Sequence, residues 1–176
     1  EAGSREGEGG AGGAGVGRRV GREDPVDGDR VSPGRGTGTA AAMGYAGESG
    51  IPFGHGLVKN SDVGRTFIEP SQTLRQLGIR LKLNVLDHVV RDKRVVVVDD
   101  SIVRGNTQRA IVRMLREAGA REVHVKISSP PVQWPCFYGI DSSSRAELIA
   151  NGATMDEITQ AVGADSLAYI SQDGMI

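Results

Sequence analysis

The sequence is short of several residue types, and each shortage excludes a class of protein. It has one cysteine, Cys136, among 176 residues, so no disulfide can form within the chain. No apolar run approaches the roughly 20 residues that a membrane-spanning helix needs. The formal net charge of −1 gives no electrostatic reason to expect nucleic acid or a membrane surface as a partner. These absences predict a protein of the reducing cytoplasm.

The first 24 residues are rich in Gly, Ala, Glu and Arg and contain hardly any larger apolar side chains. Such a segment cannot bury enough apolar area to offset the entropy lost on ordering. We therefore predict a disordered tail over residues 1 to 24 and a folded domain over residues 25 to 176. Residues 10 to 15 match the G-x-G-x-x-G dinucleotide pattern, but no strand precedes them, so the pattern predicts no site here.

The rest of the chain has the pattern of an α/β protein. The four valines at 95 to 98 are typical of a central parallel strand covered on both faces. An apolar stripe at helical spacing follows over residues 110 to 118, and alternation over 121 to 127 predicts a second strand, which completes a βαβ unit. The shorter predicted elements are a helix over 37 to 50, a strand over 54 to 60, a helix from the capping-box residues Thr154 and Glu157 to Gly163, and a strand over 167 to 171.

The candidate site follows the valine run directly. Asp99 and Asp100 end the predicted strand, and ligands of an open parallel sheet bind at the carboxyl ends of its strands. Two adjacent carboxylates repel one another, so the pair needs a cation, hydroxyl donors or water nearby.

The seven residues after the acid pair supply backbone N–H groups, two hydroxyls and a permissive glycine before a helix, a combination that suits a phosphate group. They are Ser101, Ile102, Val103, Arg104, Gly105, Asn106 and Thr107. A sugar phosphate would satisfy both the acid pair and this loop. The alternative is that the aspartates are solvated and the loop only caps the helix.

The string VVVVDDSIVRGNT closely resembles the phosphoribosyl-pyrophosphate (PRPP) binding motif of type I phosphoribosyltransferases. Longer stretches, among them GIPFGHGLVKN, GRTFIEPSQTLRQLGIRLKLN and WPCFYGID, are similar to the amidophosphoribosyltransferases, the glutamine-dependent family that begins purine synthesis. The resemblance runs from about residue 38 to the end. It implies a type I phosphoribosyltransferase fold, with a central, mostly parallel sheet flanked by helices, and a fragment that lacks the family's glutaminase domain.

The resemblance also implies a reaction, in which ammonia displaces pyrophosphate from C1 of PRPP to give 5-phosphoribosylamine. Asp99 and Asp100 would contact the ribose hydroxyls and Mg²⁺, and residues 101 to 107 would hold the 5′-phosphate. A pyrophosphate loop corresponds to residues 32 to 39, where Gly38 and Thr39 would bind substrate and Thr37 replaces a serine that contacts the metal. A flexible loop over about residues 61 to 84 would close over PRPP, and its cations would neutralise the pyrophosphate: Arg65, Arg75 and Lys82, with Lys59 and Arg80 as further candidates.

Further partners follow from the same resemblance. Cys136 stands where one branch of the family has a [4Fe–4S] ligand, but a cluster normally needs four cysteines, so we expect a free thiol here and a ligand only in a full-length parent. Purine nucleotide inhibitors and a homo-oligomer are also implied. Without the glutaminase domain, this chain could use only free ammonia as its nitrogen source. Two other functions stay open: a purine-salvage phosphoribosyltransferase and a PRPP-binding module without activity.

Arg30 and Ser32 interrupt the apolar run that a first strand of this fold should have. A buried polar group without a partner costs about 1 to 3 kcal/mol. We therefore expect a weak first strand, which apolar substitutions at these two positions would stabilise.

Overall fold

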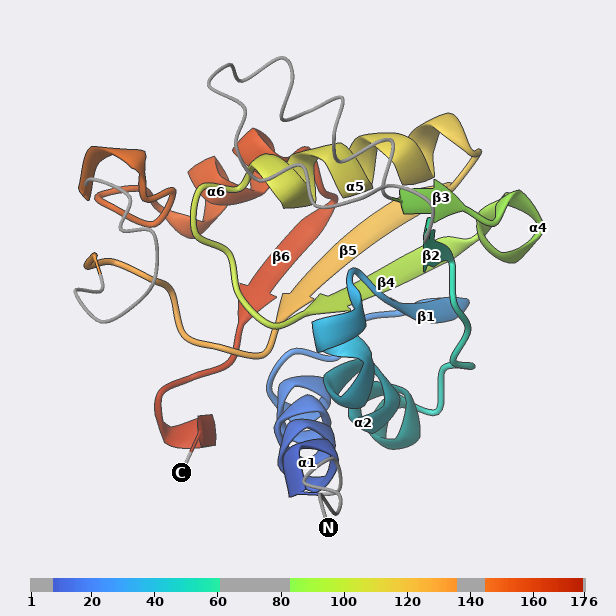
Figure 1. Ribbon diagram of the computed structural model, residues 1–176, viewed down its shortest axis with the longest axis horizontal. Coiled ribbons are helices and arrows are strands. Elements are labelled where there is room, and N and C mark those ends of the chain that lie inside the picture. Colours follow the sequence, from blue (N-terminus) through green and yellow to red (C-terminus); the bar gives the residue numbers. More distant parts are fainter. Residues whose placement is uncertain (1–7, 61–82, 136–144, 176) are drawn as a thin grey trace, which may run out of the picture.

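A four-stranded sheet forms the centre of the protein (Figure 1). The computed structural model describes residues 8–60, 83–135 and 145–175. The strand order is β1–β4–β5–β6, and all three pairings are parallel. The strands are β1 (Arg30–Pro33), β4 (Arg94–Asp99), β5 (Glu122–Ile127) and β6 (Ser166–Tyr169). A separate antiparallel pair consists of β2 (Leu57–Lys59) and β3 (Leu83–Val85).

Helices cover both faces of this sheet (Figure 1). Helices α1 (Glu8–Glu23) and α2 (Thr39–Ser49) pack on one face, and α5 (Asn106–Glu117) and α6 (Met155–Val162) pack on the other. The short elements are α4 (Asp87–Val90) and the 3-10 helices η1 (Gly36–Gly38), η2 (Arg145–Glu147) and η3 (Asp173–Met175). The predicted α/β class with a central parallel sheet flanked by helices is confirmed.

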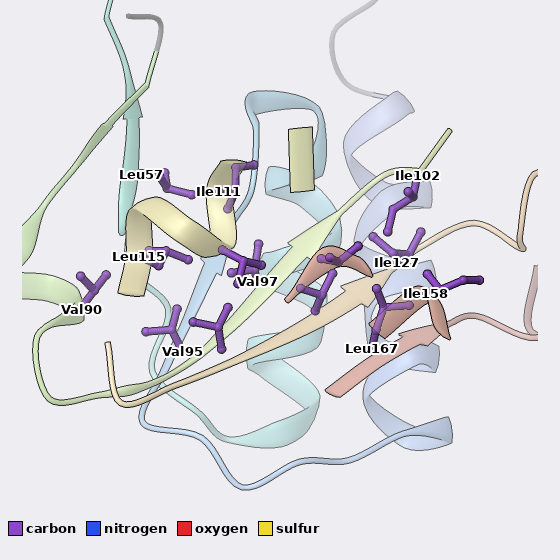
Figure 2. Close-up of a cluster of buried hydrophobic side chains, with 14 of the residues drawn as sticks. Leu57, Val90, Val95, Val97, Ile102, Ile111, Leu115, Ile127, Ile158 and Leu167 are labelled. Atoms are coloured by element: carbon purple, nitrogen blue, oxygen red, sulfur yellow. The ribbon is translucent and has the colours of Figure 1, made fainter. Parts of the chain in front are cut away.

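The valine run of β4 is buried on both faces, as its composition predicts. Val95 and Val97 pack with Ile111 and Leu115 of α5 (Figure 2). Val96 and Val98 face the opposite way and join the cluster under α1 and α2. All four valines are fully buried, so the end of this strand is held rigidly where the acid pair begins.

Helix α1 forms within the segment for which the sequence predicts a disordered tail, so that prediction is wrong for residues 8 to 23. The helix packs closely on α2 through small residues. A Cβ atom added at Gly17 would lie 1.9 Å from the carbonyl oxygen of Ala41, and one added at Gly44 would lie 1.9 Å from that of Ala14. The two helix backbones therefore approach more closely than larger side chains would allow. This close packing buries the surface between α1 and α2 although the segment has few bulky apolar side chains.

Strand β1 forms although Arg30 and Ser32 are polar. Of the two, Ser32 lies inside the sheet, and its hydroxyl has hydrogen-bond partners. The Ser32 side chain is fully buried, accepts a hydrogen bond from the Gly56 amide at 3.0 Å and donates one to the Pro33 carbonyl at 3.1 Å. Arg30 is only partly buried and donates to the Phe53 carbonyl at 3.4 Å. The expectation that both residues are unpaired defects is wrong for Ser32.

The remaining predicted elements agree with the structure. Helix α6 begins with the capping box of Thr154 and Glu157 and ends at Gly163 in the left-handed conformation. Helix α2 likewise ends at Gly50 with φ of 72°.

None of the helices in the described ranges is long and apolar enough to cross a membrane.

Candidate functional site

The site lies where the carboxyl ends of β1 and β4 meet, at the edge that the sequence predicts for ligands. The Gly34 amide donates to the Val98 carbonyl at 2.9 Å, which brings the chain after β1 across the end of β4. A Cβ atom at Gly38 would lie 2.6 Å from the Val98 carbonyl oxygen and 3.0 Å from the Asp99 Cα. Only glycine fits there, and its presence places η1 against the acid pair.

Arg35 joins the two aspartates from the loop between β1 and η1. Its Nε donates to Asp99 Oδ2 at 3.0 Å and to Oδ1 at 3.3 Å, while its Nη2 donates to Asp100 Oδ1 at 2.6 Å. The Asp99 side chain has no exposed surface, whereas the side chains of Arg35 and Asp100 are 38% and 42% exposed. One guanidinium therefore spans both carboxylates at the surface of the site.

Other donors complete the shell of the acid pair. Asp99 Oδ1 accepts from the Asp100 amide at 2.9 Å, and Asp99 Oδ2 accepts from the side chain of Gln108. Asp100 Oδ1 accepts from the Ser101 amide at 2.7 Å. These bonds fix the orientation of both carboxylates.

Sequence reasoning predicts that the acid pair needs compensation, but it does not identify Arg35. The residue lies within the segment assigned to the pyrophosphate loop, 64 positions before Asp99. The signal that identifies it is an arginine two residues after a strand that pairs in parallel with β4, because parallel neighbours end at the same edge of a sheet.

The pKa values of the three groups reflect competition between burial and charge. Burial acts to lower the pKa of Arg35, but the two carboxylates outweigh it and the net shift is upward. Burial acts to raise the pKa of Asp100, but Arg35, Thr37 and the Ser101 amide together lower it. For Asp99, burial outweighs the charge of Arg35 and raises the pKa. The guanidinium thus stays charged, and the exposed acid is the more easily ionised of the two.

The loop after the acid pair divides into a buried part and an open part. The Ile102 side chain is 1% exposed and belongs to the core, so it offers no side-chain contact to a ligand. The Val103 carbonyl accepts from the Ile149 amide at 2.9 Å, and Arg104 pairs with Glu147 at 3.5 Å. These three residues anchor the loop to the body of the protein.

The open part is the start of α5. Gly105 takes the N-cap position with φ of 76°, and a glycine has no side chain with which to cap the helix. Among the described residues, no side chain accepts from the backbone N–H groups of the first turn, and free groups of this kind can bind phosphate. Asn106 and Thr107 begin the helix beside these groups. The positive φ favours glycine at this position, and a Cβ atom there would also lie 2.5 Å from Ile149 Cδ1, the mobile end of a side chain.

Several predicted site residues lie outside the described residues. They are Arg65, Arg75, Arg80, Lys82 and Cys136. Of the predicted loop over residues 61 to 84, only the last two are described, and they belong to β3. Lys59 is exposed at the end of β2, and Thr39 begins α2.

The acid pair in this arrangement does not fit a magnesium ion bound to both carboxylates. Within residues 8–60, 83–135 and 145–175, no three His, Cys, Asp or Glu side chains gather as metal ligands. A divalent cation that bridges Asp99 and Asp100 would take the place of the Arg35 guanidinium, or would face its charge across a few ångströms. The metal role predicted for Asp99 and Asp100 together therefore conflicts with this geometry, and the one predicted for Thr37 stays a prediction.

Comparison with known proteins gives the chain clear relatives, although no protein-family model matches it. It is 64% identical over 166 residues to the amidophosphoribosyltransferase of Mycobacterium tuberculosis, a match that covers 92% of this chain and 32% of that protein. It is 55% identical over 161 residues to the amidophosphoribosyltransferase of Bacillus subtilis, which covers 92% of this chain and 34% of that protein. The chain spans about a third of the length of the curated relatives that it matches.

Solved structures agree with these relatives. The structure of an allosteric regulatory enzyme of purine biosynthesis matches with a TM-score of 0.84 and 54% identity, over 94% of this chain and 36% of that one. A glutamine PRPP amidotransferase from B. subtilis, complexed with ADP and GMP, matches with the same TM-score and 53% identity. These matches confirm the resemblance to the amidophosphoribosyltransferases.

Proposed function

We propose that this chain is the phosphoribosyl-transferring part of an amidophosphoribosyltransferase. It binds PRPP at the carboxyl edge of the sheet and catalyses displacement of pyrophosphate from C1 by ammonia, the first step of purine synthesis. The observation that carries the proposal is the order of groups at the end of β4: an acid pair, a short loop and a helix N-terminus without a side-chain cap. This order offers acceptors to ribose hydroxyls and donors to a phosphate ester.

Each part of the site has a task in this reaction. The first-turn N–H groups of α5 and the Thr107 hydroxyl hold the 5′-phosphate, and Asp100 accepts a hydrogen bond from a ribose hydroxyl. Asp99 is buried and orients Asp100 and Arg35. A bond forms between nitrogen and C1 while the C1–O bond breaks, the diphosphate leaves with the electron pair, and the nitrogen loses a proton to water.

Stabilisation of the transition state depends mainly on neutralising the leaving diphosphate, because this group gains negative charge as the C1–O bond breaks. The proposed cations for this task are Arg65, Arg75 and Lys82, with the backbone at Gly38 and Thr39 as the loop that faces the diphosphate. Mg²⁺ remains an expectation from the resemblance, and no step here passes through it.

Other partners are proposed from the relatives. One of them is named as a glutamine PRPP amidotransferase and was solved with ADP and GMP, which supports glutamine as the source of ammonia and purine nucleotides as inhibitors. A homo-oligomer, a place in the cytoplasm and a [4Fe–4S] ligand role for Cys136 in a longer parent protein belong to the same proposal.

The test is ammonia-dependent release of pyrophosphate from PRPP, with adenine, hypoxanthine and orotate as competing acceptors. Free ammonia is used because the assay then needs no second catalytic domain. Asp100→Asn should lower kcat/KM about 100-fold, since a charged acceptor for the ribose is lost. Asp156→Asn, which removes a carboxylate from the exposed first turn of α6, is the matched control and should change it less than about twofold.

The outcomes separate the three candidate functions. Faster transfer to a purine or pyrimidine base than to ammonia would identify a salvage enzyme. PRPP binding without turnover of any acceptor would identify a non-catalytic module. Full activity in Asp100→Asn would remove the acid pair from the mechanism.

A further inference from the structure

We propose that Arg35 is a built-in cation of the acid pair, which takes the position between Asp99 and Asp100 and keeps divalent metal ions off both carboxylates. This inference rests on the proposed function only for the kind of ligand that binds beside the pair, a sugar phosphate. The exclusion of metal is a property of the chain alone.

The contacts of Arg35 are those of a dedicated partner. Its Nε and Nη2 lie on one edge of the planar guanidinium, and they reach Asp99 at 3.0 Å and Asp100 at 2.6 Å. This edge matches two carboxylates side by side, and a fork of this shape is more specific than a lysine ammonium. The bond to Asp99 is protected from solvent on the acid side, because that side chain is fully buried.

The backbone around Arg35 holds the guanidinium in this place. The Gly38 amide donates to the Arg35 carbonyl at 3.0 Å and closes the turn of η1. Just before Arg35, a Cβ atom at Gly34 would lie 3.2 Å from Asp99 Oδ2 and 3.1 Å from Val97 Cγ1. The chain therefore passes directly over the buried carboxylate, and a side chain leaving at Arg35 has only a short path to the acids.

Three of the four carboxylate oxygens of the acid pair already accept hydrogen bonds. Both oxygens of Asp99 accept hydrogen bonds, from Arg35, the Asp100 amide and Gln108. Asp100 Oδ1 accepts from Arg35 and from the Ser101 amide. A divalent ion would have to displace the guanidinium from a buried anion and then remain beside it, so its binding at the pair is opposed by both lost bonds and repulsion.

The direct test is Mn²⁺ binding to the protein without any other ligand, measured by electron paramagnetic resonance. Wild-type protein and Arg35→Lys should bind Mn²⁺ weakly, because both keep a cation at the pair. Arg35→Gln should bind it about tenfold more tightly or better, and Arg35→Gln combined with Asp100→Asn should lose that gain. Arg113→Gln, which removes a similar charge from an exposed i,i+4 pair on α5, is the control and should resemble wild type.

Stability gives a second readout on the same variants. Mn²⁺ should raise the melting temperature of Arg35→Gln and leave that of wild type unchanged, because the ion replaces the lost guanidinium only in the variant. Equal Mn²⁺ affinity in wild type and Arg35→Gln would overturn the proposal, whether both bind tightly or neither does.

Wild-type protein alone supplies a test that does not depend on the folding of any variant. Its affinity for ribose 5-phosphate, which carries no diphosphate to bring a metal with it, should differ by less than about twofold between Mg²⁺ and EDTA. Strong Mg²⁺ dependence would contradict the built-in cation. Absence of binding to both ribose 5-phosphate and PRPP would instead contradict the proposed function, while the Mn²⁺ result would still decide the role of Arg35.

Discussion

At the scale of single residues, Ser32 contributes to the sheet through the partner that its hydroxyl holds. The Oγ atom accepts from the Gly56 amide inside the protein, where no exposed surface remains on the serine. A buried N–H group that loses its acceptor costs about 1 to 3 kcal/mol, more than one extra methyl group gains. The hydroxyl thus connects β1 to the segment before β2.

We predict that Ser32→Val lowers the free energy of unfolding by about 1 to 3 kcal/mol, because the Gly56 amide is left without its acceptor. Urea unfolding followed by circular dichroism measures the effect. Ser32→Thr keeps the hydroxyl and is the control, with a smaller loss. A more stable Ser32→Val protein would restore the view of β1 as a strand weakened by a polar residue, as its sequence alone suggests.

Arg35 and the acid pair mark what residue patterns can and cannot predict. Adjacent carboxylates after a buried strand predict a site and a need for a compensating group, because like charges repel wherever they lie. The identity of that group depends on which strand pairs with β4 and on where the chain turns after it. The parallel register of β1 and β4, with Pro33 opposite Val98, brings Arg35 to the acids. Register is a long-range property that local patterns do not contain.

At the scale of elements, the crossing of α1 and α2 depends on two glycines, one in each helix. Each faces a backbone carbonyl of the other helix at a distance that no Cβ atom tolerates. Composition alone predicts disorder here because it counts apolar side chains. Composition does not take into account that small residues let two helices approach until their backbones are in contact.

We predict that Gly17→Ala and Gly44→Ala each destabilise the protein by about 1 to 3 kcal/mol or more, because overpacking forces the two helices apart. Gly15→Ala is the matched control on α1, since nothing lies within 4 Å of an added Cβ there. The control should stabilise the protein by about 0.5 to 1 kcal/mol through helix propensity. Thermal unfolding of the three variants compares them. Three similar results would mean that α1 does not pack on α2.

At the scale of the whole molecule, the βαβ unit of the sheet can be predicted from the sequence, whereas the contacts that hold helix α1 against the rest of the protein cannot. The run of valines, the stripe of α5 and the alternation of β5 each report local burial, so they predict a βαβ unit that the structure confirms. The links from α1 to the far end of the chain have no local signature. Glu23 accepts from the amide and the hydroxyl of Ser171, and Arg19 donates to the Gly174 carbonyl.

The link between Asp24 and Lys126 is the one that most directly couples this helix to the sheet. The Lys126 side chain is fully buried on β5, and its ammonium pairs with Asp24 just after α1. Burial lowers the pKa of Lys126, and Asp24 opposes this shift by stabilising the charged form. Removal of one partner from such a pair is more costly than removal of both, because it leaves a charge without compensation.

We predict that Asp24→Asn destabilises the protein at pH 7 by about 1 to 3 kcal/mol and makes its stability rise with pH. Without Asp24, the pKa of Lys126 should fall further below its ordinary value. A lysine whose pKa is lower in the folded than in the unfolded state costs stability below the folded pKa, and this cost disappears as pH rises towards the unfolded value. Asp24→Asn combined with Lys126→Met should recover much of the loss and remove the added pH dependence. Urea unfolding at pH 7 and 9 measures both effects, and an equally unstable double variant would show that Asp24 acts through other contacts.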